Sequence, residues 1–414
     1  MAEVSKKSLK KKQMEEIPEE QWALPSDEMV LSFGPQHPAT HGTLRIVLEL
    51  DGEIIKKATP HIGYLHSGFE KLGEHKNYNQ WIPLSDRMNY LSAINNNIGF
   101  AQAVEKLIGV DIPERAKYLR VIMAELSRIS DHMVWLGTHA LDIGAFTAFL
   151  YTFEIREELY NIFEHASGAR LTNSYTRIGG LMRDVPDDFE DQIKRFIKTF
   201  HRLFDETDRL LTKNRIWVDR TTGIGYLSKE DAISYGVTGP VLRGSGVQYD
   251  VRKNFPYLVY DQFDFDVPYA TEGDVYARYL VRMEECRQSI RIIEQAMKKL
   301  PGGPVRIENH KLILPDKTEV YSTIESLIHH FKITMRGHGF DIPEGEIYDA
   351  TEAPNGELGF YIVSDGSNTA YRLRVRPPSF VNYSCFGEIV QGNMVSDVVA
   401  VLGSLNIIAG ELDR

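Results

Sequence analysis

Cysteine is nearly absent from this 414-residue chain, in which Cys286 and Cys385 are the only two. Two distant thiols cannot build a disulfide-rich scaffold, a four-cysteine zinc site or an iron–sulfur cluster held by this chain alone. Such sparing use of cysteine predicts a reduced, cytosolic setting. Chemistry that needs a cluster of thiolate ligands is therefore excluded for this chain on its own.

Long apolar runs are missing as well. No stretch reaches the 18 or so residues that indicate a membrane-spanning helix. The nearest candidate, residues 398–410, is short and contains Gly403, Ser404 and Asn406, so it predicts a buried helix and its exit. Residues 1–27 mix lysine with glutamate and lack the apolar core of a signal peptide, which predicts a flexible or partner-docking tail. Any association with a membrane is therefore expected to depend on a partner.

Motifs for nucleotide binding do not occur either. The chain has neither a G-x-G-x-x-G turn after a strand nor a G-x-x-x-x-G-K-[ST] loop, so we do not expect it to bind a nucleotide itself. A net charge of −11 argues against nucleic acid as its main ligand. The length and the charged fraction of 25% are those of a globular protein with two or three packed domains.

Hydrophobic periodicity predicts a small β region at residues 28–66, followed by a helical bundle at 67–300. In the β region, alternation places Leu44, Ile46 and Leu48 on one face, and Asp51-Gly52 is a favourable hairpin turn. We expect Ser85 to cap the first helix of the bundle and Asp111 to cap the next, with Pro113 in its first turn. Further helices are expected at about 146–167, 187–212 and 272–299.

Residues 301–414 predict a C-terminal α/β region. Turns at 354–356 and 365–368 separate three extended segments, which together indicate a β-meander. One more helix, at about 394–403, is expected before a terminal tail at 410–414. The predicted fold class is α+β and predominantly helical, with a central bundle of long helices between the two β regions, rather than a doubly wound sheet.

The segment most suggestive of chemistry is Gly34-Pro35-Gln36-His37-Pro38-Ala39-Thr40-His41-Gly42. It places two histidines on a stiff turn between two predicted strands, and imidazole is well suited to moving protons near neutral pH. The spacing of His37 and His41 also allows a zinc pair, although Pro38 disfavours a helix there and no glutamate follows as in H-E-x-x-H. A third interpretation is that both rings only bond to the backbone of a tight turn.

Other candidates are isolated side chains. Tyr90, near an expected helix start, can serve packing alone. Asp142 lies among small and apolar residues at a helix end, either as a cap or as a buried carboxylate that needs a partner such as a histidine. Pairing would raise the pKa of that histidine. His61 and His66 flank Gly63, which favours a structural turn or an interface over a ligand site.

Together these segments resemble the family of the quinone-site subunit of NADH:quinone oxidoreductase, the D subunit in the nomenclature of respiratory complex I. The resemblance spans the chain from about residue 28 to its C-terminal end. Its motifs are GPQHPATHG at 34–42, PHIGYLHSGFEKL at 60–72, VEKLIGV at 104–110, ELSRISDHMVWLGTHALDIGA at 125–145, YIVSDGS at 361–367 and RVRPPSF at 374–380.

That family is similar in fold to the large subunit of [NiFe] hydrogenases, which holds its metals with two Cys-x-x-Cys pairs. Here Asn89 and Ser92 stand where the first pair would be, and residues 404–414 contain no cysteine for the second. Soft thiolate ligands are required by such a centre, so this chain is not expected to be a hydrogenase or to hold a metal or a flavin. The former metal pocket is expected to accept an organic ligand.

The resemblance implies an enzyme that is active only as part of a multisubunit, proton-pumping NADH:quinone oxidoreductase. It places the quinone head group on His41 and Tyr90, with Asp142 as the acidic partner of His41 and Thr138 as a pocket-lining residue. Quinone is the implied substrate, and the electrons come from an iron–sulfur cluster in a partner subunit that forms the other wall of the site. Other peripheral-arm and membrane-arm subunits are implied as partners, on the cytoplasmic side of a bacterial inner membrane.

Three alternatives remain open on the sequence. The chain could be a non-redox scaffold for iron–sulfur and membrane subunits, or a subunit of a related ferredoxin- or F420-linked membrane oxidoreductase. It could also be a soluble metal hydrolase built on His37 and His41.

Overall fold

The computed structural model describes residues 28–40, 42–309, 311–335 and 339–414. The predicted N-terminal tail at 1–27 and the imidazole of His41, which we expected at the quinone site, lie outside the described residues. The structural statements below refer to the described ranges.

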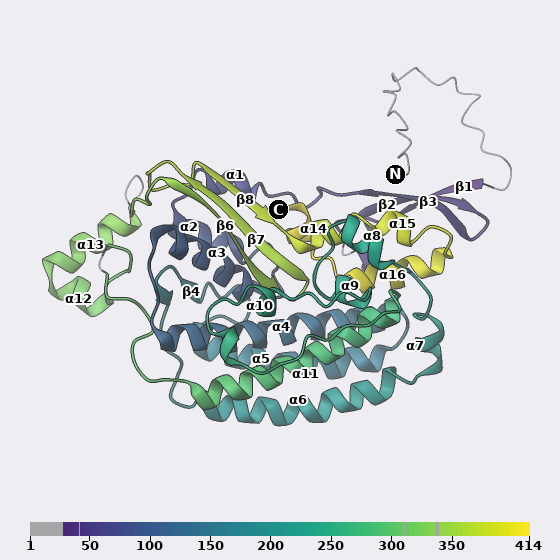
Figure 1. Cartoon of the computed structure of the whole chain (residues 1–414), viewed down its shortest axis with the longest axis horizontal. Helices are drawn as coiled ribbons and strands as arrows, with labels where there is room; N and C mark the ends of the chain where they lie inside the picture. Colours follow the sequence, from purple (N-terminus) through teal and green to yellow (C-terminus); the bar gives the residue numbers. More distant parts are fainter. Residues whose placement is uncertain (1–27, 41, 310, 336–338) are drawn as a thin grey trace, which may run out of the picture.

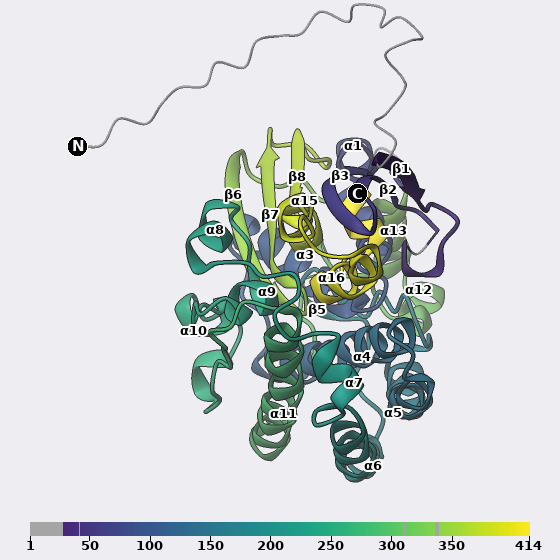
Figure 2. The same ribbon diagram turned by 90° about the vertical axis from the view of Figure 1, so that its right-hand side faces the viewer.

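A layer of long helices forms one side of the molecule, and two small sheets lie over its opposite ends (Figure 1). Viewed along the helices, the layer is a bundle in which neighbouring helices pack side by side (Figure 2). This arrangement confirms the predicted α+β class with its central helical bundle. The long helices are α4 (Glu114–Asp142), α5 (Phe146–Ser167), α6 (Phe189–Leu211) and α11 (Val275–Lys299).

The N-terminal sheet is antiparallel in the order β1 (Glu28–Phe33), β2 (Arg45–Asp51) and β3 (Ile54–His61). Leu44 and the alternating apolar residues of β2 are at most 2% exposed, as the period-two pattern predicted. Helices α15 (Phe386–Ile389) and α16 (Val398–Leu405) pack against the apolar face of this sheet. The loop that carries His37 therefore starts and ends on ordered strands.

The predicted C-terminal meander is confirmed as an antiparallel sheet of β6 (Gly345–Ala353), β7 (Gly356–Ser364) and β8 (Arg372–Arg376). Helix α3 (Ala93–Ile108) packs across β6 and β7. Phe100 of that helix meets the Phe360 ring at a centroid distance of 5.7 Å. This contact fixes the helix that follows Tyr90 against the meander.

The remaining elements are short: η2 (Pro38–Thr40), α1 (Phe69–Gly73), α2 (Tyr78–Ser85), β4 (Thr176–Arg177), β5 (Gly180–Leu181), α7 (Arg215–Asp219), α8 (Lys229–Ser234), α9 (Gly239–Gly244), α10 (Val251–Asn254), η3 (Tyr260–Gln262), α12 (Lys317–Ser322), α13 (Ile324–Thr334), α14 (Pro378–Tyr383), η4 (Val395–Asp397) and α17 (Ala409–Asp413).

Two predicted helix starts are wrong. Ser85 is the last residue of α2, where its hydroxyl donates to the Ile82 carbonyl at 2.7 Å, and the next helix begins only at Ala93. Tyr90 therefore lies in the turn between α2 and α3. Helix α4 begins at Glu114 rather than after Asp111: Pro113 is its N-cap, and the Asp111 carboxylate accepts from the N–H of Ile112 and from the Lys117 ammonium instead of capping the helix.

The predicted terminal tail is an ordered part of the core. Residues Ala409–Asp413 form α17, in which Glu411 is 1% exposed and Leu412 is 2% exposed. An added Cβ at Gly410 would lie 2.5 Å from the carbonyl oxygen of Arg87, so α17 is pressed against the turn before Tyr90. The end of the described chain thus contributes directly to the candidate site.

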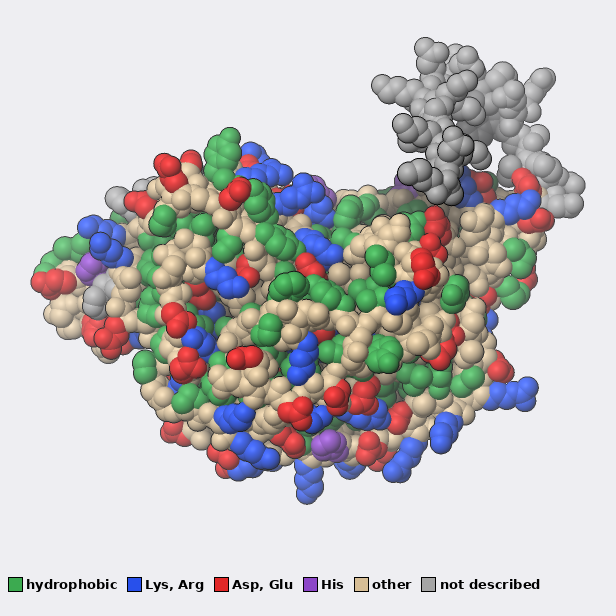
Figure 3. All heavy atoms as spheres, in the orientation of Figure 1, with side chains coloured by type: hydrophobic (Ala, Val, Ile, Leu, Met, Phe, Trp, Pro, Cys, Tyr) green, Lys and Arg blue, Asp and Glu red, His purple; other side chains and the backbone are tan. Residues whose placement is uncertain are grey.

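Charged side chains gather along the outer edge of the helix layer, over α6 and α11 (Figure 3). Helix α6 explains this distribution, since it buries Phe196, Phe200 and Phe204 and turns pairs such as Glu190–Lys194 to the solvent. Among the described residues, no helix is both long enough and apolar enough to cross a membrane.

Candidate functional site

The turn that carries Tyr90 is fixed by the side chain of Asn89, which is fully buried. The Asn89 amide oxygen accepts the backbone N–H groups of Leu91 at 3.1 Å and Ser92 at 3.2 Å. Its amide nitrogen donates to a carboxylate oxygen of Asp131, on α4, at 3.1 Å. One side chain therefore shapes the turn and ties it to the longest helix of the bundle.

The second oxygen of Asp131 reaches the C-terminal segment. It accepts from the amide nitrogen of Asn406 at 2.9 Å, and the same nitrogen donates to Asn355 at 2.6 Å. Asn406 ends α16 in a left-handed conformation, with φ of 50°, which asparagine tolerates better than most residues. The two segments that would carry the thiolate pairs of a hydrogenase are thus joined by buried amides and a carboxylate.

Tyr90 itself is half-buried. Burial, and then the negative charge of Asp131, raise the pKa of the phenol above its ordinary value of 10.0. The phenol is therefore neutral across the physiological range and can donate a hydrogen bond.

The same face of α4 carries two of the predicted site residues. Steps of seven and eleven residues are close to whole turns, so Thr138 and Asp142 lie in line with Asp131, about 10 and 16 Å along the axis. The Thr138 hydroxyl donates to the carbonyl of Val134 at 2.8 Å, so its hydrogen bond is made within the helix. Asp131, Thr138 and Asp142 thus share one face of α4. The Tyr90 turn contacts this face at Asp131, through Asn89.

Asp142 is the last residue of α4, within electrostatic reach of His37. Its side chain reaches the surface of the isolated chain, yet burial by the surrounding atoms raises the pKa of the carboxyl to about 6, and a positive charge on His37 opposes this. The sequence predicted His41 as the partner of Asp142, and that residue lies outside the described ranges. Among the described residues, His37 is the histidine whose charge acts on Asp142.

His37 is held firmly in its loop. Its Nδ1 accepts the backbone N–H of Ala39 at 3.1 Å, and its ring lies against Phe33 with centroids 4.3 Å apart. In the neutral ring this contact places the proton on Nε2. The backbone-bonded interpretation is thus right for His37.

His66 belongs to a structural turn, as the sequence favoured, whereas His61 is the last residue of β3. The Asp413 carboxylate accepts the backbone N–H groups of Gly63 at 2.8 Å and Leu65 at 2.7 Å, and the His66 Nδ1 lies 2.8 Å from the carbonyl oxygen of Asp413. The loop is therefore anchored to α17, next to the Tyr90 turn.

Sequence comparison adds the decisive observation. The family described as respiratory-chain NADH dehydrogenase, 49 kDa subunit, matches residues 142–414. The chain belongs to this family.

Curated relatives extend the similarity over nearly the whole chain, and each is named as the D subunit of NADH-quinone oxidoreductase. The relative from Geotalea uraniireducens (strain Rf4) is 54% identical over 386 residues, which cover 93% of this chain and 98% of the relative. The relative from Methylacidiphilum infernorum (isolate V4) is 52% identical over 388 residues, covering 94% and 92%. One from Sorangium cellulosum (strain So ce56) is 51% identical over 400 residues, covering 96% and 98%.

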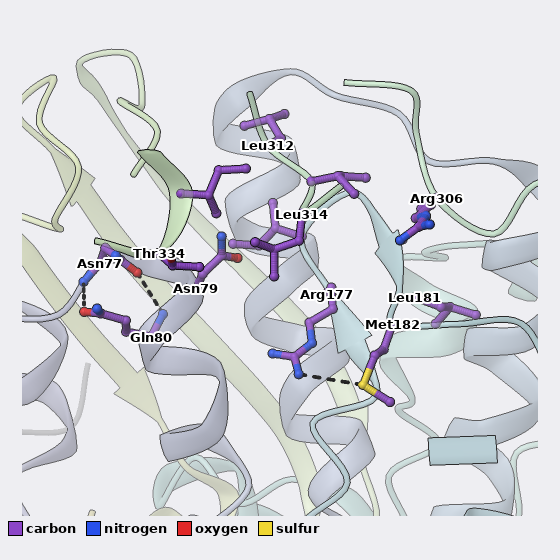
Figure 4. A pocket seen from close by; sticks show the side chains of 14 residues that line it. Asn77, Asn79, Gln80, Arg177, Leu181, Met182, Arg306, Leu312, Leu314 and Thr334 are labelled. Carbon is purple, nitrogen blue, oxygen red and sulfur yellow. Dashed lines mark hydrogen bonds between the residues drawn. The ribbon is translucent and has the colours of Figure 1, made fainter. Parts of the chain in front are cut away.

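In this member of the 49 kDa family, the described residues contain no group of three or more His, Cys, Asp or Glu side chains arranged to hold a metal ion. A cavity of about 400 Å³ lies elsewhere, between α2, the β4–β5 hairpin and residues 312–314 (Figure 4). Arg177 extends from β4 beside it, with a guanidinium nitrogen 3.9 Å from the Met182 sulfur. Tyr90, Thr138 and Asp142 are not among the residues that line it.

A further carboxyl in the network was not predicted from the sequence. Glu411 of α17 accepts the hydroxyl of Ser379 and is almost completely buried. Burial raises the pKa of its carboxyl to about 7, with Ser379 opposing that change and the charge of Asp131 adding to it. The sequence offered no signal for this, because one glutamate near a chain end is usually exposed.

We expect Glu411 to make the free energy of unfolding depend on pH. Because its folded pKa is raised above the reference value of 4.5, the folded chain holds this proton more tightly, and stability is lost as the pH rises from about 4.5 to about 7. The loss is on the order of 3 kcal/mol. Glu411→Gln removes this dependence on pH. In urea unfolding, the free energy of unfolding of the variant should therefore rise relative to that of the native chain as the pH increases from about 4.5 to about 7. Below pH 4.5 both side chains are neutral, and the two proteins should be equally stable. A constant difference at every pH would contradict the assignment.

Proposed function

We propose that this chain is a core subunit of a proton-pumping NADH:quinone oxidoreductase, active within that complex, and that it forms one wall of the site where quinone is reduced to quinol. The observation that carries the proposal is the placement of Asp142 and the Tyr90 turn along one face of α4 in a member of the 49 kDa family. The relatives, named as subunits of NADH-quinone oxidoreductase, support the same reaction.

In this proposal Tyr90 and His41 each donate a hydrogen bond to one carbonyl oxygen of the quinone head group, and Thr138 lines the pocket. Reduction to the quinol takes up two electrons and two protons. The electrons come from an iron–sulfur cluster of a partner subunit, and the protons pass through Tyr90 and the histidine loop. A phenol with a raised pKa holds its proton against neutral quinone and releases it only to the more basic reduced form.

Asp142 would couple this chemistry to proton translocation. A carboxyl whose pKa is about 6 changes charge readily when the charge on a neighbouring imidazole changes. Proton loss from the histidine loop would leave the Asp142 carboxylate without a cationic partner. That change in local charge would bias a conformational switch toward the membrane arm.

Exposed apolar side chains beside Asp142 support a partner at this place. Leu141, Phe146 and Leu150 are 38%, 58% and 52% exposed, although they surround the end of α4 where the site lies. We assign this surface to the iron–sulfur subunit that closes the quinone site. The remaining peripheral-arm and membrane-arm subunits would hold the chain as a peripheral component on the cytoplasmic side of a bacterial inner membrane.

Tyr90→Phe in the assembled complex tests the proposal. Loss of one hydrogen bond to the quinone should lower kcat/KM for quinone about tenfold to a hundredfold, while the NADH-oxidising module keeps its activity with an artificial acceptor. Tyr226→Phe is the matched control, because Tyr226 is 61% exposed and lies outside the candidate site. Identical quinone KM and kcat in Tyr90→Phe and native complex would instead support the scaffold alternative.

A further inference from the structure

We propose that Asp131 is a positioning residue for quinone reduction: its buried carboxylate locks the Tyr90 turn in place through Asn89 and presents a fixed negative charge to the phenol. The inference rests on the proposed role of Tyr90 and adds a residue that neither the sequence motifs nor the comparisons single out. It follows from how Asp131 is bonded, how it is buried and which groups surround it.

The bonding of Asp131 requires a carboxylate. Each of its two oxygens accepts from an amide nitrogen, one from Asn89 at 3.1 Å and the other from Asn406 at 2.9 Å. An asparagine at this position offers only one accepting oxygen and would set its own NH2 group against one of the donors. Only an aspartate therefore satisfies the turn and the C-terminal segment at the same time.

The charge of Asp131 is not neutralised by contact. Its side chain is 0% exposed, and within the described ranges no Lys, Arg or His nitrogen forms an ion pair with it. Its field instead reaches titratable groups on every neighbouring element: Tyr90 of the turn, His132 of α4, Arg156 of α5, Arg282 of α11 and Glu411 of α17. At Tyr90 it is the one charged group that adds to the effect of burial.

Both effects of Asp131 prepare the Tyr90 phenol to donate its proton to the reduced quinone. The hydrogen bond to Asn89 holds the backbone of the turn, so the phenol meets the quinone already ordered. The negative charge disfavours tyrosinate, so the phenol keeps its proton until the reduced quinone is basic enough to take it. An uncharged hydrogen-bonding residue at 131 could provide the first effect but not the second.

Two variants of the assembled complex separate these effects. Asp131→Asn alone breaks the double acceptor. Asp131→Asn combined with Asn406→Asp moves the carboxylate across the pair, away from Asn89, and keeps a donor opposite an acceptor at both contacts of residue 131. The Asn355 amide must flip to donate to the new carboxylate, at the cost of its contact with Ser379. The measurements are the amount of assembled complex and the quinone KM and kcat as functions of pH.

We expect the single variant to raise the quinone KM about tenfold, because an asparagine cannot accept from Asn89 and Asn406 together and the brace of the turn is weakened. The double variant should recover KM to within about twofold. Its alkaline limb of kcat/KM should nevertheless move to lower pH by about half a unit or more, because the carboxylate no longer bonds to Asn89, the neighbour of Tyr90. A double variant with the native pH profile would show that Asp131 acts only through structure, and native kinetics in the single variant would show that the turn does not need it. Failure of both variants to assemble would assign Asp131 to folding and reject the proposal.

Tyr90→Phe distinguishes this inference from the proposed function. If Tyr90→Phe loses activity while both Asp131 variants match the native complex, only the role of Asp131 is wrong. If Tyr90→Phe is itself unchanged, the quinone-site role of Tyr90 is wrong, whatever the Asp131 variants do.

Discussion

Arg243→Met is expected to remove about 3 to 5 kcal/mol from the free energy of unfolding. Arg243, on α9, is 0% exposed and contacts carboxylates from two other elements. Its guanidinium donates to Glu285 of α11 at 2.5 and 2.8 Å and to Glu352 of β6 at 2.8 Å, and it lies 3.6 Å from Asp250. Methionine fills a similar volume but leaves these acidic groups buried without their shared cation.

The rest of this buried cluster cannot compensate for the loss. Arg252 already pairs with Asp250 at 2.6 Å and with Glu125 at 3.1 Å, and Arg128 lies 3.2 Å from Glu125. Arg243 is the first charge that holds the pKa of Glu285 well below its ordinary value. Without it, Glu285 would have to take up a proton or draw water into the core, and both are costly.

A matched surface arginine provides the control. Arg291 also contacts two carboxylates, those of Asp264 and Asp266, but its side chain is 41% exposed and theirs are 79% and 78% exposed. Arg291→Met should therefore cost no more than about 1 kcal/mol. Urea unfolding followed by circular dichroism, with equal slopes for the three proteins, gives the comparison. Equal losses in the two variants would show that the buried cluster is not held by its charges.

Gly239→Ala is expected to cost about 3 kcal/mol, the second largest effect. Gly239 begins α9 with φ of +70°, and an added Cβ would lie 2.4 Å from the Gly356 Cα and 2.6 Å from the Asn355 carbonyl oxygen. Both neighbours are backbone atoms, so no side chain can rotate away. The displacement would also reach Asn355, which bonds to Asn406 in the network beside Tyr90.

Gly109→Ala is the control that separates the cost of a left-handed backbone from the cost of a steric clash. Gly109 ends α3 with φ of +75°, nearly the same backbone conformation, but an added Cβ there meets no atom within 4 Å. The control should lose only the cost of a left-handed alanine, about 1 kcal/mol. Thermal and urea unfolding of the two variants measure the difference. If both glycines prove equally sensitive, the close approach of α9 to β7 does not limit stability.

The long helices were predictable because their signal is local. Apolar residues recur every three or four positions in α5, α6 and α11, and their observed bounds lie within three residues of those expected. The starts at Ser85 and Asp111 were not predictable in the same way. A polar residue before an apolar run is compatible with capping, with a turn or with the end of the preceding helix, and only the packing of the chain decides.

The site was predictable only in part. Motif resemblance led to Tyr90, Thr138, Asp142 and His41; the structure places the first three on or beside α4, and the site role of all four stays a prediction. The network around Asp131 was missed, because its partners lie 42 and 275 residues away along the chain. No periodicity marks such a pair. The electrostatic effect of His37 on Asp142 was also missed, because the two residues are far apart in the sequence.

The contact between the Tyr90 turn and the segment of Asn406 and Gly410 has a consequence for biosynthesis. A nascent chain that has left the ribosome as far as the long helices still lacks the residues that brace this turn. Local helices can form during translation, but contacts between distant segments must wait for the later segment to emerge. The Tyr90 turn is therefore braced only after residues 406–410 have emerged, later than the long helices of the bundle.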